Sequence, residues 1–393
     1  MNAAGLVGLL RLKITRLFAF FHRCFRHAVV HARGAAFGNG GRCGFGDDVF
    51  GRGGGAGYGA GAGNVADGTE AHVADLGNFA FAFRRQRGNG DEQPAAFDDF
   101  AFVAVINRRQ REVFAGEIIE SDIDMVIGND ITTPISIKQF ERSGATKLAN
   151  PDGFSVVMDH YIPAKDILSA NQAKISRDFA YKHDLKNYFD EKDMGIEHAL
   201  LPEKGLVVPG DVIIGADSHT CTHGALGAFA TGMGSTDLAY AMITGKNWFK
   251  VPPTIKVIFR GKLDRHVYGK DLILEIIRRI GVDGALYKAL EFTGETIDSL
   301  DMDGRFSMCN MAIEAGGKSG IIAVDETTKE FLKGKSLRAE PKLHYSDEGA
   351  NYEQILEIDV TNLDPVIAYP FLPSNGKSVR EAVKDDIAID QAF

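Results

Sequence analysis

The sequence predicts an α/β fold from residue 112 onward, with mostly parallel sheets and flanking helices. Short apolar runs alternate there with helix-like segments, as expected for parallel strands joined by crossover helices. Three of these runs end abruptly in polar residues. Threonine, proline and glycine stand where the intervening helices should begin and end.

The first apolar run ends in Asn129 and Asp130, and a helix should follow it. Thr133 is expected to be the N-cap of this helix and Pro134 to occupy its first turn. Gly144 can end it.

Two more runs end in the same way. The second ends in Asp159 and His160, and the third ends in Asp217, Ser218 and His219, with Ser235 and Thr236 expected to cap the next helix. One strand-end aspartate is usually only a turn residue. Ligands of open α/β sheets bind outside the carboxyl ends of the strands, so we expect the three polar clusters to meet in one crevice.

Other polar residues have a structural alternative. His198 stands between apolar neighbours and could equally be a core histidine. Asn310 and Glu314 are four positions apart in a helix-like segment, on one face, and could form a solvated stripe. Cys221 and Cys309 are expected to be small buried residues.

Glycines follow the third cluster. Gly224, Gly227, Gly232 and Gly234 permit close backbone approach and predict a cradle for carboxylate or phosphate at a helix N-terminus. No GxGxxG motif forms, because Asp237 occupies the third glycine position, which argues against a dinucleotide site.

Composition excludes several classes of protein. The formal net charge of −9 argues against nucleic acid and anionic membranes as partners. No apolar run is long enough to span a membrane. The four cysteines show no CxxC spacing, so neither a disulfide framework nor a zinc site is predicted. A reducing, cytoplasmic location is expected.

Residues 1–111 differ from the rest of the chain. They hold thirteen arginines and one lysine, whereas residues 112–393 hold nine arginines and 21 lysines, which marks a domain boundary near Arg111. The glycine-rich run beginning at Gly51 lacks the context of a phosphate loop. We expect 1–111 to be a disordered low-complexity extension or a misassigned start; the acid-free stretch from Arg11 to Gly46 leaves a transit peptide as the alternative.

Several segments together resemble the large subunits of the 3-isopropylmalate dehydratases, in the aconitase superfamily. They are MVIGNDITTP, VVMDH, MGIEHALLPEKGLVVPGDVIIGADSHTCTHGALGAFATGMGSTDLA, VDGALYKALEFTGE and MCNMAIEAG. The resemblance covers residues 112–393 and implies an aconitase-like α/β/α fold around a [4Fe-4S] cluster. It also implies a hydro-lyase that converts 2-isopropylmalate to 3-isopropylmalate in leucine biosynthesis, with a small subunit as its partner.

The resemblance assigns roles to the candidate residues. The catalytic acid–imidazole groups would be Asp159, His160, His198, Asp217, His219 and Glu314, and the groups that contact the hydroxy dicarboxylic acid substrate would be Asn129, Asp130, Ser218 and Asn310. Paired carboxylates and imidazoles suit a dehydration, because the departing hydroxide needs a proton and the carboxylate fixes the tautomer of its histidine. The pairs to examine are His219 with Glu314 and His198 with Asp217 or Asp159; the sequence leaves the pairing open.

The sequence departs from the family at the metal ligands. The family holds its cluster with three cysteines in GSCTN-like and CGPC-like segments, and neither segment precedes Phe393. Cys221 and Cys309 do not match the ligand positions. The serine base of the swivelling domain, which is the small subunit in these enzymes, is also absent. We therefore expect a truncated chain that is inactive by itself and holds no cluster.

Three alternatives stay open. Homoaconitase or another hydratase of the superfamily would use the same residues on a different acid. A mononuclear zinc or manganese hydrolase would use the six acids and imidazoles as metal ligands. A non-catalytic fragment is the third possibility.

Overall fold

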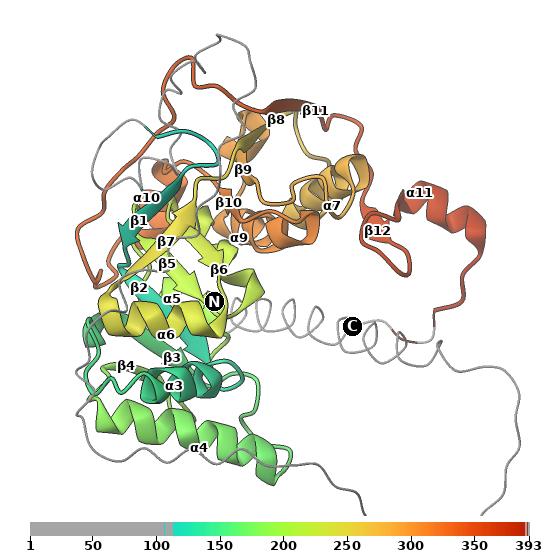
Figure 1. Ribbon diagram of the computed structural model, residues 1–393. Helices are drawn as coiled ribbons and strands as arrows, with labels where there is room; N and C mark the ends of the chain where they lie inside the picture. Colours follow the sequence, from blue (N-terminus) through green and yellow to red (C-terminus); the bar gives the residue numbers. More distant parts are fainter. Residues whose placement is uncertain (1–105, 107–112, 390, 392–393) are drawn as a thin grey trace, which may run out of the picture. The chain divides into compact units, whose positions relative to one another are not determined.

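The computed structural model describes residues 106, 113–389 and 391. Except for Ile106, the expectations for the extension at 1–111 lie outside the described residues. The described part contains two parallel sheets, two short antiparallel strand pairs and flanking helices, which confirms the predicted α/β class (Figure 1).

The first sheet is parallel throughout and has five strands. Their order is β4 (Asn187–Phe189), β3 (Phe154–Val157), β2 (Met125–Asn129), β5 (Val212–Gly215) and β6 (Phe229–Gly232). The three strands predicted to end in polar clusters, β3, β2 and β5, are direct neighbours. Their carboxyl ends therefore lie at one edge of the sheet.

Both faces of this sheet are covered. Every residue of β2, β3 and β5 is buried, as is usual for parallel strands between two layers. Alternate side chains point to opposite faces. Val126 and Val156 join a core with Phe140 of helix α3 (Thr133–Arg142), whereas Ile127 and Val157 join a second core on the other side. Helix α3 also packs against α6 (Ser235–Thr244) (Figure 1).

The second sheet is also parallel. Its order is β10 (Ser319–Ile321), β9 (Ala289–Thr293), β8 (Thr254–Arg260) and β11 (Gln354–Asp359). Helix α7 (Gly269–Ile280) packs on α9 (Met302–Asn310) beside it. Val257 and Phe259 of β8 belong to the same core as Ile127 and Val157, so one hydrophobic core joins the two sheets.

The remaining elements are short, apart from α4. The antiparallel pairs are β1 (Ile118–Asp122) with β7 (Lys246–Lys250) and β12 (Val366–Ala368) with β13 (Gly376–Ser378). The other helices are α4 (Ile167–Lys182), α5 (Glu197–Glu203), α8 (Glu295–Asp298), α10 (Glu326–Leu332) and α11 (Val379–Ala382). The 3-10 helices are η1 (Pro151–Gly153), η2 (Ser218–Leu226), η3 (Met311–Ala315) and η4 (Val383–Asp385).

Gly224 serves close packing and does not form the predicted ligand cradle. It lies in η2, where a Cβ atom would stand 1.8 Å from the carbonyl oxygen of Gly320 in β10. No side chain fits there, so the two backbones touch directly. Gly227 ends η2 with a φ of +74°, a conformation that favours glycine.

Two helix starts differ from their predictions by one or two residues. The N-cap of α3 is Thr132, not Thr133, because the side-chain oxygen of Asn129 already accepts the backbone N–H groups of Ile131 and Thr132. Helix α6 has Gly234 as its N-cap, since the chain leaving β6 stays extended up to that residue.

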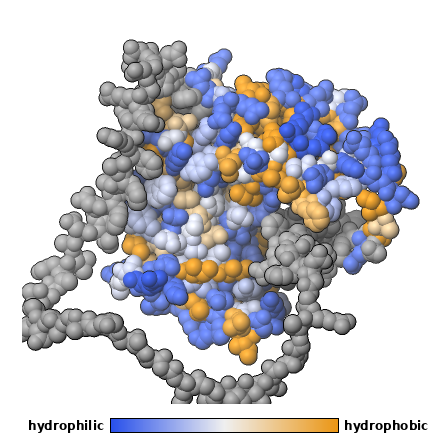
Figure 2. Space-filling view, turned by 45° about the vertical axis from the view of Figure 1, so that its right-hand side comes forward, coloured by the Kyte–Doolittle hydropathy of each residue, from blue (hydrophilic) through white to orange (hydrophobic). Residues whose placement is uncertain are grey.

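The surface carries separate apolar areas among hydrophilic ones on the face shown in Figure 2. The most exposed large apolar side chains include Ile167, Leu168, Phe371 and Ile389. No helix in the described residues is both long and apolar enough to cross a membrane.

Candidate active site

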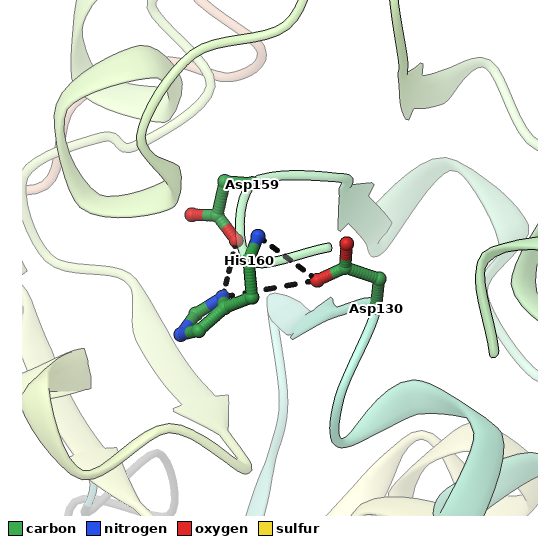
Figure 3. Close-up of side chains that lie close together, drawn as sticks. All are labelled: Asp130, Asp159 and His160. Carbon is green, nitrogen blue, oxygen red and sulfur yellow. Dashed lines mark hydrogen bonds and ion pairs between the residues drawn. The ribbon is translucent and has the colours of Figure 1, made fainter. Parts of the chain in front are cut away.

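The loops after β2 and β3 form the first acid–imidazole cluster (Figure 3). Nδ1 of His160 lies 2.6 Å from Oδ1 of Asp159 and 3.8 Å from Oδ1 of Asp130. The carboxylate of Asp130 is fully buried and accepts the backbone N–H groups of His160 and Tyr161. Asp130 therefore fixes the loop that carries His160, while Asp159 orients its ring.

Asn129 braces this cluster against helix α5. Its side-chain N–H donates to Oε2 of Glu197 at 3.0 Å, and its oxygen accepts from the turn that follows β2. The backbone N–H of Glu197 in turn donates to Oδ2 of Asp159. Asn129 is 1% exposed. In this structure its amide supports the site from behind and does not face solvent.

A second cluster combines α5 with the end of β5. Nε2 of His198 lies 3.1 Å from Oδ1 of Asp217, and Nδ1 of His198 lies 3.2 Å from Nε2 of His223. Burial opposes a charge on His198, but the hydrogen bond that His198 donates to Asp217 and the charges of the nearby carboxylates outweigh it and raise the pKa of His198. Burial likewise opposes the charge on Asp217, whose pKa is nevertheless lowered by His198. Each member of the pair therefore favours the charged form of the other.

His219 connects the first sheet with the second. Asp217 is the N-cap of η2 and accepts the backbone N–H of His219 at 2.7 Å. Nδ1 of the His219 ring lies 3.0 Å from the carbonyl oxygen of Asn310, and Nε2 lies 3.8 Å from Oε1 of Glu314. His219 and Glu314 are each more than a quarter exposed. A ligand can therefore reach both.

Asn310 and Glu314 do not lie on one α-helical face as expected. Asn310 is the last residue of α9, and Glu314 belongs to the 3-10 helix η3, which ends at Gly316. A 3-10 helix has three residues per turn, so positions four apart point in different directions. The amide of Asn310 donates to Thr222 at 2.8 Å, and Glu314 faces His219.

The structure thus gathers the predicted residues, with two additions that sequence reasoning missed. Asp159 pairs with His160, and Asp217 pairs with His198. The missed residues are Glu197 and His223, both fully or almost fully buried. Burial raises the pKa of Glu197. A glutamate inside the apolar stretch MGIEHALL and a second histidine in HTCTH were the available signals.

Two groups of side chains have ligand atoms close enough to hold a metal ion. They are Asp130, Asp159 and His160, and Glu197, His198 and Asp217. In the first group both Asp130 oxygens bind backbone N–H groups. In the second group Asp217 binds His198 and a backbone N–H. Hydrogen bonds account for these contacts, although Oε1 of Glu197 is buried without a hydrogen-bond partner. The two arrangements give no specific support to the metal hydrolase alternative.

A cavity of about 400 Å³ opens beside the second cluster. Asp217, Ser218 and Ile313 line it on the site side, and Lys318 and Tyr287 contribute a cation and an aromatic ring. Ser218 is exposed. Burial lowers the pKa of Lys318, whose ammonium group lies 5.5 Å from the ring centroid of Tyr287. The cavity combines apolar walls with charges of both signs, because Lys250, Asp217 and Asp237 line it together with Lys318.

Two parallel sheets thus adjoin a site lined with acids and imidazoles. The model of the aconitase family (aconitate hydratase) matches residues 104–393. The chain therefore belongs to the aconitase family.

Its relatives within that family carry one name. The large subunit of 3-isopropylmalate dehydratase from Campylobacter curvus is 91% identical over 283 residues, which are 72% of this chain and 67% of the relative. The proteins of the same name from Campylobacter concisus and Wolinella succinogenes are 87% and 80% identical over the same shares of both chains. The matched region thus spans about two thirds of each relative.

The family implies an iron–sulfur cluster, which needs cysteine thiolates as ligands. Cys221 and Cys309, the described cysteines, are both fully buried, as predicted. Burial raises the pKa of Cys221 to about 12 and that of Cys309 well above its ordinary value. Both therefore stay protonated thiols, and they do not fit as cluster ligands. The described residues supply acids and imidazoles to the site.

Stability should fall as the pH rises through the titration of His160. Burial opposes the charge, but the bond to Asp159 and the surrounding carboxylates raise the pKa of His160 to about 9. The contribution of His160 to the free energy of unfolding is complete below the pKa of about 6.5 in the unfolded chain and is lost by about pH 9. This contribution is about 1–3 kcal/mol. Chemical denaturation at both pH values measures it.

His160→Gln should lose this part of the pH dependence, whereas His266→Gln, at an exposed histidine, should keep it. Other groups titrate in the same pH range. Only the difference in the pH dependence of stability between the variant and the parent chain therefore reports on His160. Equal pH dependence of the parent and His160→Gln would contradict the assignment.

Proposed function

We propose that this chain carries the acid–imidazole wall of the large subunit of a 3-isopropylmalate dehydratase. As a hydro-lyase in leucine biosynthesis, that enzyme would act with a small subunit and convert 2-isopropylmalate to 3-isopropylmalate. The observation that carries the proposal is the 91% identity to a protein of that name across the segments that hold the site. The inactivity of the chain by itself stays a prediction.

The exposed imidazoles are suited to proton transfer at the substrate. His219 is held at Nδ1 by the carbonyl of Asn310, and its Nε2 faces Glu314. We assign to His219 the donation of a proton from Nε2 to the departing hydroxyl group, which leaves as water, and to Glu314 the supply of a replacement proton to Nε2. His160 carries a positive charge at neutral pH and would attract a substrate carboxylate.

The buried groups take supporting roles in this proposal. The side chains of Asn129 and Asp130, which are expected to contact the substrate, are buried and hydrogen-bonded inside the protein. We assign them the positioning of the loop of His160. Ser218 and Lys318, beside the cavity, are better placed to bind a carboxylate, and the apolar walls suit an isopropyl group.

Binding of 2-isopropylmalate to the chain tests the proposal without requiring turnover. In spectra of the chain with ¹⁵N-labelled histidine rings, we expect the resonances of His160 and His219 to shift as the ligand is added. The exposed His266 serves as the internal control. Spectra that stay unchanged at saturating ligand, or that change only at His266, would count against the proposed function.

A further inference from the structure

We infer that His223 is a positioning residue that holds the ring of His198 from the side opposite Asp217. Nδ1 of His198 and Nε2 of His223 are 3.2 Å apart, and the rings meet edge to face with their centroids 5.1 Å apart. His223 is fully buried and His198 is 6% exposed. The contact itself does not depend on the proposed function. Only the expected effect of His223 on turnover, through His219, rests on that function.

Asp217 determines which ring nitrogen of His198 always carries a proton. Its carboxylate accepts from His198, so His198 carries a proton on Nε2. Neutral His198 then has a lone pair on Nδ1 and accepts the Nε2–H of His223. Protonated His198 instead donates from Nδ1, and His223 must carry its own proton on Nδ1. A histidine at position 223 serves both states at the contact with His198 because its tautomer can change, and its own Nδ1 is buried without a hydrogen-bond partner in either state.

The charge stays on His198 and not on His223. Burial, followed by the charge of His198, lowers the pKa of His223 well below its ordinary value. The groups that face His198 are Asp217, Glu197, Asp159 and His223, and those that face His223 are His198 and Asp217. Negative groups thus surround His198, whereas its neighbour His223 remains neutral.

Both ring nitrogens of His198 are occupied inside the protein. His198 therefore orients Asp217, and Asp217 fixes the backbone of His219. Without an acceptor at residue 223, the Nδ1–H of protonated His198 would be buried and unpaired, which disfavours the charged form. His223 thus affects the position of the partly exposed His219 through His198 and Asp217.

The first test uses the unaltered chain. With ¹⁵N-labelled histidine rings, we expect a scalar coupling across the hydrogen bond between Nδ1 of His198 and Nε2 of His223, together with protonation of His198 at Nε2. The absence of this coupling throughout the titration of His198 would overturn the inference. This outcome is independent of whether the chain binds 2-isopropylmalate.

The second test compares two amides at position 223. In His223→Gln an amide atom can reach the place of Nε2, whereas the shorter side chain of His223→Asn ends near the place of Nδ1. We expect the pKa of His198 to stay within about half a unit of its value in the unaltered chain for glutamine and to fall by about 1–2 units for asparagine.

His266→Gln should leave the titration of His198 unchanged. A purely structural role of His223 predicts no difference between the two amides, and equal pKa values of His198 in both would therefore refute the positioning role. If His223→Asn does not fold, the coupling in the unaltered chain decides the question.

Discussion

Replacing His219 with alanine should reduce turnover by about 10²-fold or more in an enzyme completed by the remaining third of a relative's large subunit and by the small subunit. Glu314→Gln should have an effect of the same size. The reason is that the Nε2 atom of His219 faces the Glu314 carboxylate at a partly exposed position, where the pair can deliver a proton to the departing hydroxyl group.

Turnover should be measured as consumption of 2-isopropylmalate and formation of 3-isopropylmalate, with thermal unfolding as a check on folding. The control is His266→Gln, which changes an exposed histidine away from the site and should keep full turnover. Near-normal turnover of either site variant, with an intact fold, would remove that residue from the proposed mechanism. Turnover of homocitrate in place of 2-isopropylmalate would favour the homoaconitase alternative.

Asp325→Asn should destabilise the protein by about 3–5 kcal/mol, because it leaves a buried guanidinium group without its counter-charge. Arg305, in the helix that ends at Asn310, is 0% exposed and binds Asp325 through two hydrogen bonds of 2.6 and 2.5 Å. For a domain of this size the melting temperature should fall by roughly 6–20 °C.

Asp325 is also the N-cap of α10, and asparagine at this position can serve as an N-cap as well. A matched control is Asp301→Asn, at the exposed N-cap of α9, which should change little. Burial opposes the charge of Asp325, but Arg305 lowers the pKa of this carboxyl group below 3.8. Its stabilisation is present above that pH and is lost as the pH falls through the lowered pKa. The difference in unfolding free energy between Asp325→Asn and the parent chain should therefore become smaller at acidic pH. Equal unfolding free energies of the two chains at neutral pH would contradict the expected destabilisation.

The edge of the first sheet could be predicted because it depends on local patterns and on one topological rule. Apolar runs identify β2, β3 and β5, and parallel strands place their carboxyl ends together. Asp159, His160 and Asp217 follow those runs directly. Their convergence therefore needed no knowledge of side-chain packing.

The parts of the site that escaped prediction depend on contacts distant in sequence. His223 gains its role from His198, 25 positions away, and Glu197 gains its role from Asn129, 68 positions away. Neither partner is visible in the local pattern. The change from α9 to the 3-10 helix η3 was missed for a similar reason, because a helix-like stretch such as MCNMAIEAG does not by itself distinguish the two geometries.

The direct contact between Gly224 and Gly320 has a kinetic consequence. It brings η2 against β10 with no side chain between them, and it accompanies the contact of His219 with Asn310 across 91 positions of sequence. Contacts over such separations form only after the loop between them has lost much of its conformational freedom. A nascent chain can therefore build the first sheet and still lack the position of His219 relative to Glu314. We therefore expect the pair of His219 and Glu314 to form only when η3 and β10 dock against η2, which the first sheet alone does not provide.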